Sequence, residues 1–198
     1  MNYSNVFTAS PNIPERAWAL PFAGGLWSGP AVESGWSPSP AGVRHFTLQS
    51  HSKTSSEAAS GQNANLILLV EDNPADANLV RKALEEHNIE GELMVAGDGE
   101  NAIRLIEELD ALSVDCPDLI IVDLSLPKRS GREVLARLRL SARCSRVPIV
   151  ILTSSDAKKD QVEAARLGVS QYLRKPSRLE DFLNLGGILK AILAGSAR

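Results

Sequence analysis

The sequence is poor in cysteine and in aromatic residues, and it has no long hydrophobic run. Only two of its 198 residues are cysteines, and 5% are aromatic. Cys116 and Cys144 show no CxxC or CxxH spacing, so we expect two unpaired thiols in a reducing compartment, and neither a disulfide framework nor a zinc site. The longest uncharged run, residues 17–32, is broken by proline and glycine and is shorter than the ~20 apolar residues that a membrane span requires.

A secretory signal and a strongly basic charge are missing as well. The first basic residue, Arg16, follows Glu15 and lies beyond two prolines, whereas a signal peptide begins with basic residues ahead of an apolar stretch. We therefore expect a cytoplasmic protein without a membrane span. The formal net charge of -3, from 21 basic and 24 acidic residues, does not indicate a nucleic-acid-binding protein.

The composition changes at about residue 65. Residues 1–65 contain 11 serines, 6 prolines and 6 glycines, with only three acidic and three basic residues. We therefore predict a disordered, low-complexity segment over 1–65, a folded domain over 66–194 and a short tail over 195–198.

All three tryptophans lie in the first segment, nine residues apart, at Trp18, Trp27 and Trp36. A short motif for a protein partner and a contact with a membrane surface are two interpretations of this spacing. We favour a third, in which the segment is a leader without functional consequence or follows a start codon assigned too far upstream.

From Leu66 onward, short apolar runs alternate five times with amphipathic helical stretches. This alternation predicts an α/β fold around a parallel sheet. The expected strands span residues 66–70, 93–96, 119–122, 147–152 and 169–173. The expected capping residues are Asn73 with Pro74 and Asp76 for the first helix, Asp156 for the fourth, and Ser177 with Glu180 for the last.

The last expected helix contains two adjacent glycines, Gly186 and Gly187. Each glycine in a helix interior costs about 1 kcal/mol relative to alanine. We therefore expect either fraying of the helix at this point or an unusually close contact with another element.

Polar residues follow four of the five expected strands. Glu71 and Asp72 follow the first, Asp123 the third, Thr153 the fourth and Lys175 the fifth. A parallel sheet covered by helices places its working residues beyond the carboxyl ends of the strands. The five side chains are therefore expected to converge.

Three converging carboxylates repel one another, so such a cluster is stable mainly when a hard cation occupies it. We expect Mg²⁺, with Asp72 and Asp123 as direct ligands and Glu71 acting through water. A backbone carbonyl near Ser125 would add a further oxygen ligand.

The remaining two strand-end residues suit phosphoryl chemistry. Lys175 supplies a positive charge that could hold both Asp123 and a phosphoryl oxygen, and the hydroxyl of Thr153 could donate a hydrogen bond to another. Together with the metal, these groups are sufficient to form an aspartyl phosphate on Asp123.

The stretches LILLVEDNPADANLV, PDLIIVDLSLPKRSGREVL, VPIVILTSS and QYLRKPS resemble the receiver domain of two-component response regulators. The similarity covers about residues 64 to 194. The EDNPAD and DLxLPKxxG motifs resemble more narrowly the small single-domain regulators that partner phytochrome-type histidine kinases. The resemblance implies a flavodoxin-like, doubly wound sheet of five parallel strands in the order 2-1-3-4-5, with five helices.

The resemblance also implies a role for each site residue. Asp123 would be the phosphorylated aspartate, Glu71 and Asp72 the pair that binds Mg²⁺, and Thr153 and Lys175 the residues that contact the phosphoryl group. Tyr172 matches the aromatic switch residue, which would turn inward as Thr153 moves toward the phosphoryl group. Ser125 and Ser155 occupy the positions that tune autodephosphorylation, and because neither is a strong base we expect a long-lived phosphoryl state. A cis peptide bond at Lys175–Pro176 is a further implication.

The expected partners are proteins. The resemblance implies a histidine kinase as phosphoryl donor, a downstream protein, and a homodimer through helix 4, strand 5 and helix 5, although the glycine pair at 186–187 argues against a tight dimer. Only 23 residues follow Lys175, so we expect no DNA-binding output domain. The seven basic residues between Lys128 and Arg146 lack interleaved aromatics, so we interpret them as a solvated face or a docking patch for an acidic partner.

Two other functions fit part of the pattern. A phosphatase of the haloacid-dehalogenase type also uses a strand-end Asp, a hydroxyl, a Lys and Mg²⁺, but it requires a second Asp where this chain has Ser125. A phosphate-independent scaffold with a receiver-like site conflicts with the complete acidic cluster, although no sequence feature excludes it. We favour the phosphoacceptor, which is not an enzyme because its phosphotransfer and autodephosphorylation act only on its own Asp123.

Overall fold

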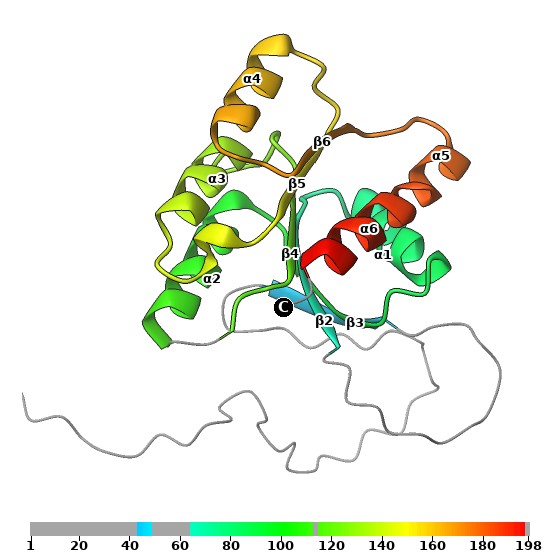
Figure 1. The fold of residues 1–198 in the computed structure, drawn as a ribbon. Helices are drawn as coiled ribbons and strands as arrows, with labels where there is room; N and C mark the ends of the chain where they lie inside the picture. Colours follow the sequence, from blue (N-terminus) through cyan, green and yellow to red (C-terminus); the bar gives the residue numbers. More distant parts are fainter. Residues whose placement is uncertain (1–42, 49–63, 113–114, 197–198) are drawn as a thin grey trace, which may run out of the picture. The chain divides into compact units, whose positions relative to one another are not determined.

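A computed structural model of the chain describes residues 43–48, 64–112 and 115–196, and the three tryptophans lie outside these ranges. A six-stranded sheet lies between two layers of helices (Figure 1). The strands are β1 (Val43–Leu48), β2 (Asn65–Val70), β3 (Gly91–Ala96), β4 (Leu119–Val122), β5 (Ile149–Thr153) and β6 (Gln171–Arg174). The helices are α1 (Pro74–Glu86), α2 (Gly99–Leu112), α3 (Gly131–Leu140), the 3₁₀ turn η1 (Cys144–Arg146), α4 (Lys158–Arg166), α5 (Leu179–Leu183) and α6 (Leu185–Ser196).

The sheet has the predicted topology with one addition. Strands β2 to β6 are parallel and lie in the order β3-β2-β4-β5-β6, which is the expected 2-1-3-4-5 order. The flavodoxin-like α/β fold is therefore confirmed, with the last of the five expected helices divided into α5 and α6.

β1 is a strand that the sequence pattern does not predict. It pairs antiparallel with β3 along its whole length. Val43 and Leu48 are buried, and the guanidinium carbon of Arg81 in α1 lies 5.9 Å from the ring centroid of Phe46. The prediction of disorder is wrong for residues 43–48, because their apolar side chains bury against a strand far along the chain. The rest of that predicted segment lies outside the described residues.

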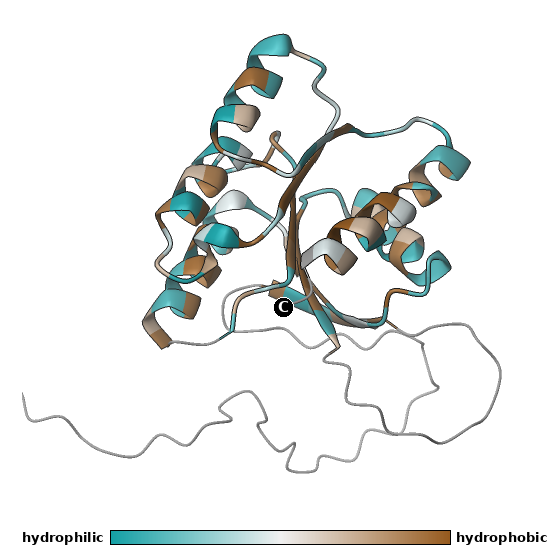
Figure 2. Cartoon of the chain, in the orientation of Figure 1, coloured by the Kyte–Doolittle hydropathy of each residue, from teal (hydrophilic) through white to brown (hydrophobic). Residues whose placement is uncertain are grey.

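The central strands are hydrophobic throughout because helices cover both faces of the sheet. All four residues of β4 are buried. One face packs against α2, α3 and α4, and the other packs against α1, α5 and α6 (Figure 1). Colouring by hydropathy shows apolar strands between helices that carry both apolar and polar faces (Figure 2). No helix in the described ranges is both long enough and apolar enough to cross a membrane.

Of the three predicted helix caps, one is confirmed and two are wrong. The side chain of Asn73 caps α1 by accepting a hydrogen bond from the backbone N–H two residues on, at 3.0 Å. The caps predicted at Asp156 and Ser177 are wrong. Ala157 and Arg178 hold the N-cap positions of α4 and α5, and neither makes a side-chain capping hydrogen bond. Both helices are therefore placed by packing rather than by their caps.

The glycine pair has different roles at its two positions. A Cβ at Gly186 would lie 2.1 Å from the carbonyl oxygen of Ala83 and 2.4 Å from Nδ1 of His87, both in or next to α1. At Gly187 the nearest atom, Nε2 of the same histidine, would be 3.4 Å away. Close packing of α6 on α1 therefore explains Gly186, and the helix is interrupted two residues earlier, at Asn184.

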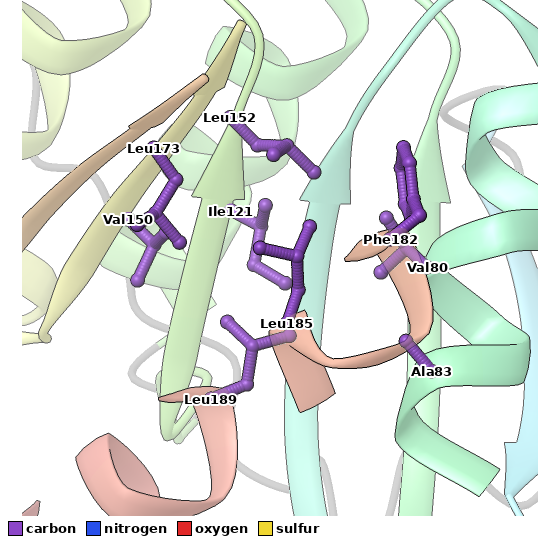
Figure 3. A pocket seen from close by; sticks show the side chains of 9 residues that line it. All are labelled: Val80, Ala83, Ile121, Val150, Leu152, Leu173, Phe182, Leu185 and Leu189. Carbon is purple, nitrogen blue, oxygen red and sulfur yellow. The ribbon is translucent and has the colours of Figure 1, made fainter. Parts of the chain in front are cut away.

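A small cavity of about 10 Å³ lies between the sheet and helices α1, α5 and α6 (Figure 3). All its lining side chains are apolar, namely Val80, Ala83, Ile121, Val150, Leu152, Leu173, Phe182, Leu185 and Leu189. A buried water needs about this much space and at least two polar partners. The cavity is therefore a packing gap and not a ligand site.

Cys116 and Cys144 form a disulfide, with their Cα atoms 5.5 Å apart. The prediction of two unpaired thiols is therefore wrong. The cysteines are 28 residues apart in the sequence. The chain through β4, α3 and η1 returns to the amino end of the sheet, so the fold brings together two residues whose spacing gives no indication of pairing.

Candidate functional site

The carboxyl ends of β2 and β4 bring three predicted acidic residues together. Glu71 and Asp72 follow β2, and Asp123 follows the neighbouring strand β4, where its backbone N–H donates to the carbonyl oxygen of Val70 at 3.0 Å. One carboxylate oxygen from each acid lies within 4.8 Å of the others. Glu71 and Asp123 are only 3% and 4% exposed, whereas Asp72 is exposed. We call these three residues the acidic cluster.

Lys175 enters the acidic cluster from the end of β6. Its Nζ lies 2.7 Å from Oδ2 of Asp123, 2.8 Å from Oε2 of Glu71 and 2.8 Å from Oδ2 of Asp76. Its backbone N–H donates to the carbonyl oxygen of Thr153 at 2.8 Å, which fixes where the side chain begins. Burial alone would lower the pKa of this ammonium group, but hydrogen bonds to the three carboxylates outweigh burial and raise its pKa.

The charges of the acidic cluster are not balanced. Burial raises the pKa of the Glu71 carboxyl, although the hydrogen bond and the charge of Lys175 act in the opposite direction. A single ammonium group faces Glu71, Asp123 and Asp76, and the Asp72 carboxylate lies beside them. The donors are oxygen atoms only, as hard divalent cations such as Mg²⁺ and Mn²⁺ prefer. The residues present therefore fit a divalent cation.

Thr153 and Tyr172 both contact the loop between β5 and α4. Thr153 is fully buried, and its Oγ1 accepts a hydrogen bond from the backbone N–H of Ser155 at 3.4 Å. The Tyr172 hydroxyl donates to the carbonyl oxygen of the same serine at 2.9 Å, and its half-buried ring packs on the core beside α4. The two predicted switch residues, one at the end of β5 and one in β6, thus contact the same loop residue, and the Tyr172 hydroxyl bonds to that loop and not to the acidic cluster.

A polar chain that the sequence does not indicate continues from this loop. The hydroxyl of Ser155 donates to Oδ2 of Asp160 in α4 at 2.6 Å, and Arg132 of α3 donates to the other oxygen of the same carboxylate. Arg132 also pairs with Glu163 at 3.2 Å. The serine hydrogen bond, and then the charge of Arg132, hold the pKa of Asp160 below its usual range. An acid in the first turn of a helix normally indicates only a cap, so Asp160 gives no sequence signal of this role.

The loop between β4 and α3 carries Ser125, which is exposed and whose backbone N–H donates to Oδ1 of Asp123 at 3.0 Å. Gly131 allows the loop to close, since a Cβ there would lie 2.1 Å from the Asp123 carbonyl oxygen. Lys128, at a φ of 63°, donates to Oδ2 of Asp98 at 2.7 Å. This ion pair fixes the loop against the turn between β3 and α2.

Asp76 is a site residue that sequence analysis assigns to another role. Its position after Asn73 predicts a capping box, but the backbone N–H of Asn73 donates to Oε1 of Glu71 at 3.1 Å, and Asp76 binds Lys175 instead. The sequence feature that could have indicated this role is the spacing of four residues between Asp72 and Asp76, about one helical turn, which in a helix would place the two carboxylates on the same side. The expected cis bond after Lys175 is also wrong, because no peptide bond in the described ranges is cis.

Comparison with known proteins agrees with this geometry. The family model described as "Response regulator receiver domain" matches residues 67–185. The response regulator Rcp1 of Synechocystis sp. is 37% identical over 121 residues, which are 61% of this chain and 82% of Rcp1. A structure of the Mn²⁺-bound form of Rcp1 superposes with a TM-score of 0.60, covering 65% of this chain and 94% of that one.

Two further structures are similar. The phosphorylated cyanobacterial phytochrome response regulator RcpA is 31% identical, with a TM-score of 0.61 and coverage of 68% of this chain and 98% of RcpA. The receiver domain of sensor histidine kinase PA1611 from Pseudomonas aeruginosa PAO1, with magnesium in its active site cleft, is 28% identical, with a TM-score of 0.53 and coverage of 66% and 99%. The family model, the topology and the acidic cluster agree, and the chain belongs to the response regulator receiver domain family.

Proposed function

We propose that this chain accepts a phosphoryl group on Asp123 from a histidine kinase and signals through a phosphorylation-dependent change in protein binding. The observation that carries the proposal is the position of the Lys175 ammonium group, 2.7 Å from an Asp123 carboxylate that is itself within 4.8 Å of two further acids. A nucleophilic carboxylate, a fixed cation and a divalent metal site are the parts that phosphoryl transfer to aspartate requires.

In the transfer step, a carboxylate oxygen of Asp123 forms a bond to phosphorus while the bond from phosphorus to the imidazole nitrogen of the donor breaks. Glu71, Asp72, Asp123 and the Ser125 carbonyl would hold Mg²⁺, which when bound supplies positive charge beside the transferred phosphoryl oxygens. Lys175 keeps its partner oxygen oriented and offsets the charge on the product.

Thr153 and Tyr172 transmit the new charge. The Thr153 hydroxyl donates to a phosphoryl oxygen, which pulls the end of β5 toward Asp123. That movement changes the loop at Ser155, to which the Tyr172 hydroxyl is bonded at 2.9 Å. The phosphoryl group therefore shifts the population of conformers on the surface formed by α4, β6 and α5.

That surface is the proposed binding site for a downstream protein or for a second copy of the chain. It carries exposed apolar side chains, including Val162 of α4, 53% exposed, and Leu179 of α5, 57% exposed. Light scattering during size-exclusion chromatography, before and after phosphorylation, tests the homodimer. An unchanged monomer in both states would remove it and leave the downstream protein as the reader.

We further propose a slow loss of the phosphoryl group. Ser125 and Ser155 occupy the positions that would orient an attacking water, and neither is a strong base. The Ser155 hydroxyl already donates to Asp160 at 2.6 Å. Measuring the decay of the phosphorylated protein by intact mass tests this, and a half-life of seconds would contradict it.

A phytochrome-type histidine kinase is the proposed donor, because RcpA, with which this chain superposes, is a phytochrome response regulator. Phosphotransfer from phosphorylated phytochrome-type kinases should proceed faster than from an unrelated histidine kinase. Equal rates from both would contradict this choice of donor and leave phosphoacceptance itself intact.

The decisive experiment is intact mass spectrometry after incubation with acetyl phosphate and Mg²⁺. A single phosphoryl adduct is expected, which is lost in Asp123→Asn and under chelation. Asp118→Asn, at the opposite end of β4, is the matched control and should retain the adduct. Absence of any adduct in the native protein would favour the phosphate-independent scaffold, whereas turnover of free phosphoesters would favour a phosphatase.

A further inference from the structure

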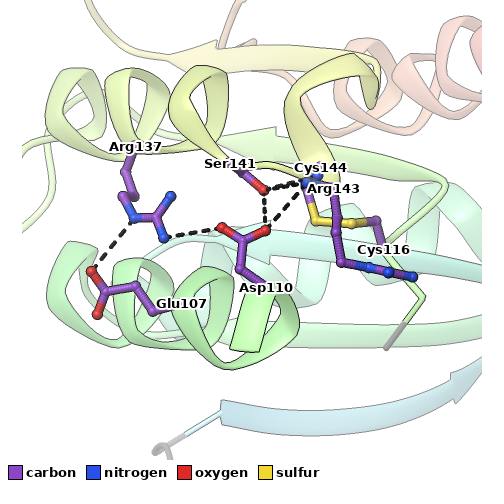
Figure 4. A network of polar contacts seen from close by, with 7 residues as sticks. All are labelled: Glu107, Asp110, Cys116, Arg137, Ser141, Arg143 and Cys144. Carbon is purple, nitrogen blue, oxygen red and sulfur yellow. Dashed lines mark hydrogen bonds and ion pairs between the residues drawn. A yellow bond between two sulfur atoms is a disulfide. The ribbon is translucent and has the colours of Figure 1, made fainter. Parts of the chain in front are cut away.

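The two cysteines of the chain lie at the end of the sheet opposite the acidic cluster. Cys116 precedes β4 and Cys144 begins η1, which leads into β5. The bond between them joins the amino ends of two adjacent strands whose carboxyl ends carry Asp123 and Thr153 (Figures 1 and 4). We propose that Cys116 and Cys144 form a reversible thiol–disulfide redox site, which goes beyond the proposed phosphoacceptor function.

The position of Cys144 is fixed by polar contacts that do not involve its sulfur. Its backbone N–H donates to the Ser141 hydroxyl at 2.8 Å, and that hydroxyl donates to Oδ1 of Asp110 at 2.6 Å (Figure 4). The other oxygen of Asp110 accepts from Arg137 at 3.1 Å. Together these contacts tie η1 to α2 and α3.

The position of Cys116 is fixed from the following residues. Pro117 is buried, and the backbone N–H of Asp118 donates to the carbonyl oxygen of Leu66 at 2.7 Å. The carboxylate of Asp118 in turn accepts from the backbone N–H of Leu66 at 2.8 Å. Cys116 therefore sits directly before an anchored strand.

The hydrogen bonds around Cys144 and Asp118, which we call the anchors, make the opening of the disulfide reversible. When the bond between Cys116 and Cys144 opens, the backbone on both sides keeps its hydrogen bonds, so the two thiols remain close to one another. A pair of thiols held at high effective concentration re-forms a disulfide without a search through other conformations.

The two sulfur atoms differ in access. Cys144 is fully buried, with 0% exposure, whereas Cys116 is half-buried and follows Asp115, which is fully exposed. An incoming thiol therefore reaches Cys116 first. The reaction partner is a small thiol–disulfide couple such as reduced and oxidised glutathione.

The exchange balances in two steps. A small thiolate attacks the Cys116 sulfur, the bond to Cys144 breaks, and Cys144 leaves as a thiolate that takes up a proton. A second small thiolate attacks the mixed disulfide and displaces Cys116, which also takes up a proton. The small thiols become one disulfide, and the protein gains two electrons and two protons; oxidation is the reverse reaction.

The test uses the full chain, whose only cysteines are these two. The protein is equilibrated in buffers of graded ratios of reduced to oxidised glutathione, quenched with acid, alkylated and weighed by mass spectrometry. Two alkyl groups are expected at the reducing end, none at the oxidising end, and one transition between them that is the same from either direction. Cysteines that stay oxidised until denaturant is added would show a permanent cross-link and overturn the proposal, as would two thiols that stay alkylatable at every ratio.

A pair of serine variants tests the role of the anchors. Ser141→Ala removes the hydroxyl that fixes Cys144, so the two reduced thiols separate more easily and the disulfide forms less readily. The equilibrium constant for disulfide formation should fall about fivefold, the equivalent of one lost hydrogen bond, and the transition should move toward more oxidising glutathione ratios. Ser145→Ala, in the same 3₁₀ turn, is the control and should leave the transition in place. Equal behaviour of the two variants would contradict pre-positioning of the thiols by Ser141.

Discussion

At the scale of single residues, Asp110 joins α2 to a segment 27 to 33 residues further along the chain, at the end of α3 and just before η1. Its carboxylate accepts hydrogen bonds from the Ser141 hydroxyl, the Arg143 backbone N–H and the Arg137 guanidinium group (Figure 4). The hydrogen bond from Ser141 is the main cause that lowers the pKa of Asp110, against the opposing effect of burial. The folded state therefore favours the ionised carboxylate.

The lowered pKa of Asp110 predicts a pH dependence of stability. Because its folded pKa lies below the unfolded value of about 3.9, the stabilisation is present above pH ~3.9 and is lost as the pH falls through the folded pKa. Asp110→Asn should therefore lower the free energy of unfolding near neutral pH and flatten its decline in acid. Urea denaturation at a series of pH values measures this, with the fully exposed Asp115→Asn as control. A variant that declines in acid as steeply as the native protein would contradict the assignment.

Lys175 gives a second prediction for a single residue. Lys175→Met leaves the Glu71 and Asp123 carboxylates buried without their cation, and breaking a buried ion pair typically costs about 3 kcal/mol or more. Added Mg²⁺ should restore part of this loss, because it replaces the missing positive charge. Urea denaturation with and without chelator measures both effects. Lys190→Met, on the surface of α6, is the control, and a Lys175 variant that responds to Mg²⁺ no more than this control would argue against a metal site.

At the scale of secondary structure, the contact between α6 and α1 depends on one of two adjacent glycines. The backbone of Gly186 approaches the last turn of α1 so closely that no side chain fits, whereas Gly187 faces more open space. At Gly186, helix propensity favours alanine whereas tertiary packing requires glycine. At Gly187, only helix propensity acts, and it favours alanine.

Alanine substitution should separate these effects. Gly186→Ala should destabilise the protein by about 2 kcal/mol or more, because the added methyl group meets the backbone of Ala83. Gly187→Ala should be neutral or stabilise by up to about 0.8 kcal/mol through better helix propensity. Chemical denaturation of both variants checks this, and two similar values would show that α6 can move away from α1.

Strand β1 covers the edge of β3, which would otherwise expose unpaired backbone groups. Leu48→Asp places a charge in a buried position and should release the strand, with a loss of about 3 kcal/mol from the apolar burial of Val43, Phe46 and Leu48. Hydrogen exchange of the β3 amides should then become faster. Thr47→Ser, at an exposed position of the same strand, should change neither quantity, and unchanged β3 exchange in the Leu48 variant would show that β1 is not needed to protect this edge.

At the scale of the whole molecule, the sheet separates two kinds of chemistry. The carboxyl ends of its strands gather Glu71, Asp72, Asp123 and Lys175, and the amino ends of β4 and β5 carry the disulfide. The length of β4 and β5 separates these two ends. A change at the disulfide should therefore alter the stability of the fold and leave the geometry and the reactivity of the acidic cluster unchanged.

Removal of the disulfide tests this separation. The two cysteines are 28 residues apart, and breaking a disulfide that closes a loop of this size is expected to lower the free energy of unfolding by about 3.6 kcal/mol. Thermal unfolding with and without a reducing agent measures the loss, and a double variant with serine at both cysteines should be insensitive to the reducing agent. Labelling by acetyl phosphate should be retained in each case, and its loss on reduction would show that the two ends of the sheet are coupled.

The sequence alone determined the alternation of strands and helices and the residues that end each strand. Strands such as Leu119–Val122 are apolar at every position, and a period of two or of 3.6 residues is a local property that needs no knowledge of the fold. Since the carboxyl ends of parallel strands lie on one edge of a sheet, the convergence of Glu71, Asp72, Asp123 and Lys175 followed from the order of the strands.

Tertiary structure decided the contacts that no local pattern encodes. The pairing of β1 with β3, the disulfide between Cys116 and Cys144, and the ion pair of Asp76 with Lys175 each join segments whose separation in space depends on how the helices return the chain. The capping residues show the same limit, because Asn73 begins a helix whereas Asp156 does not. Hydrophobic periodicity determines which face of an element is buried, but the distance between two faces is set only when the elements pack together.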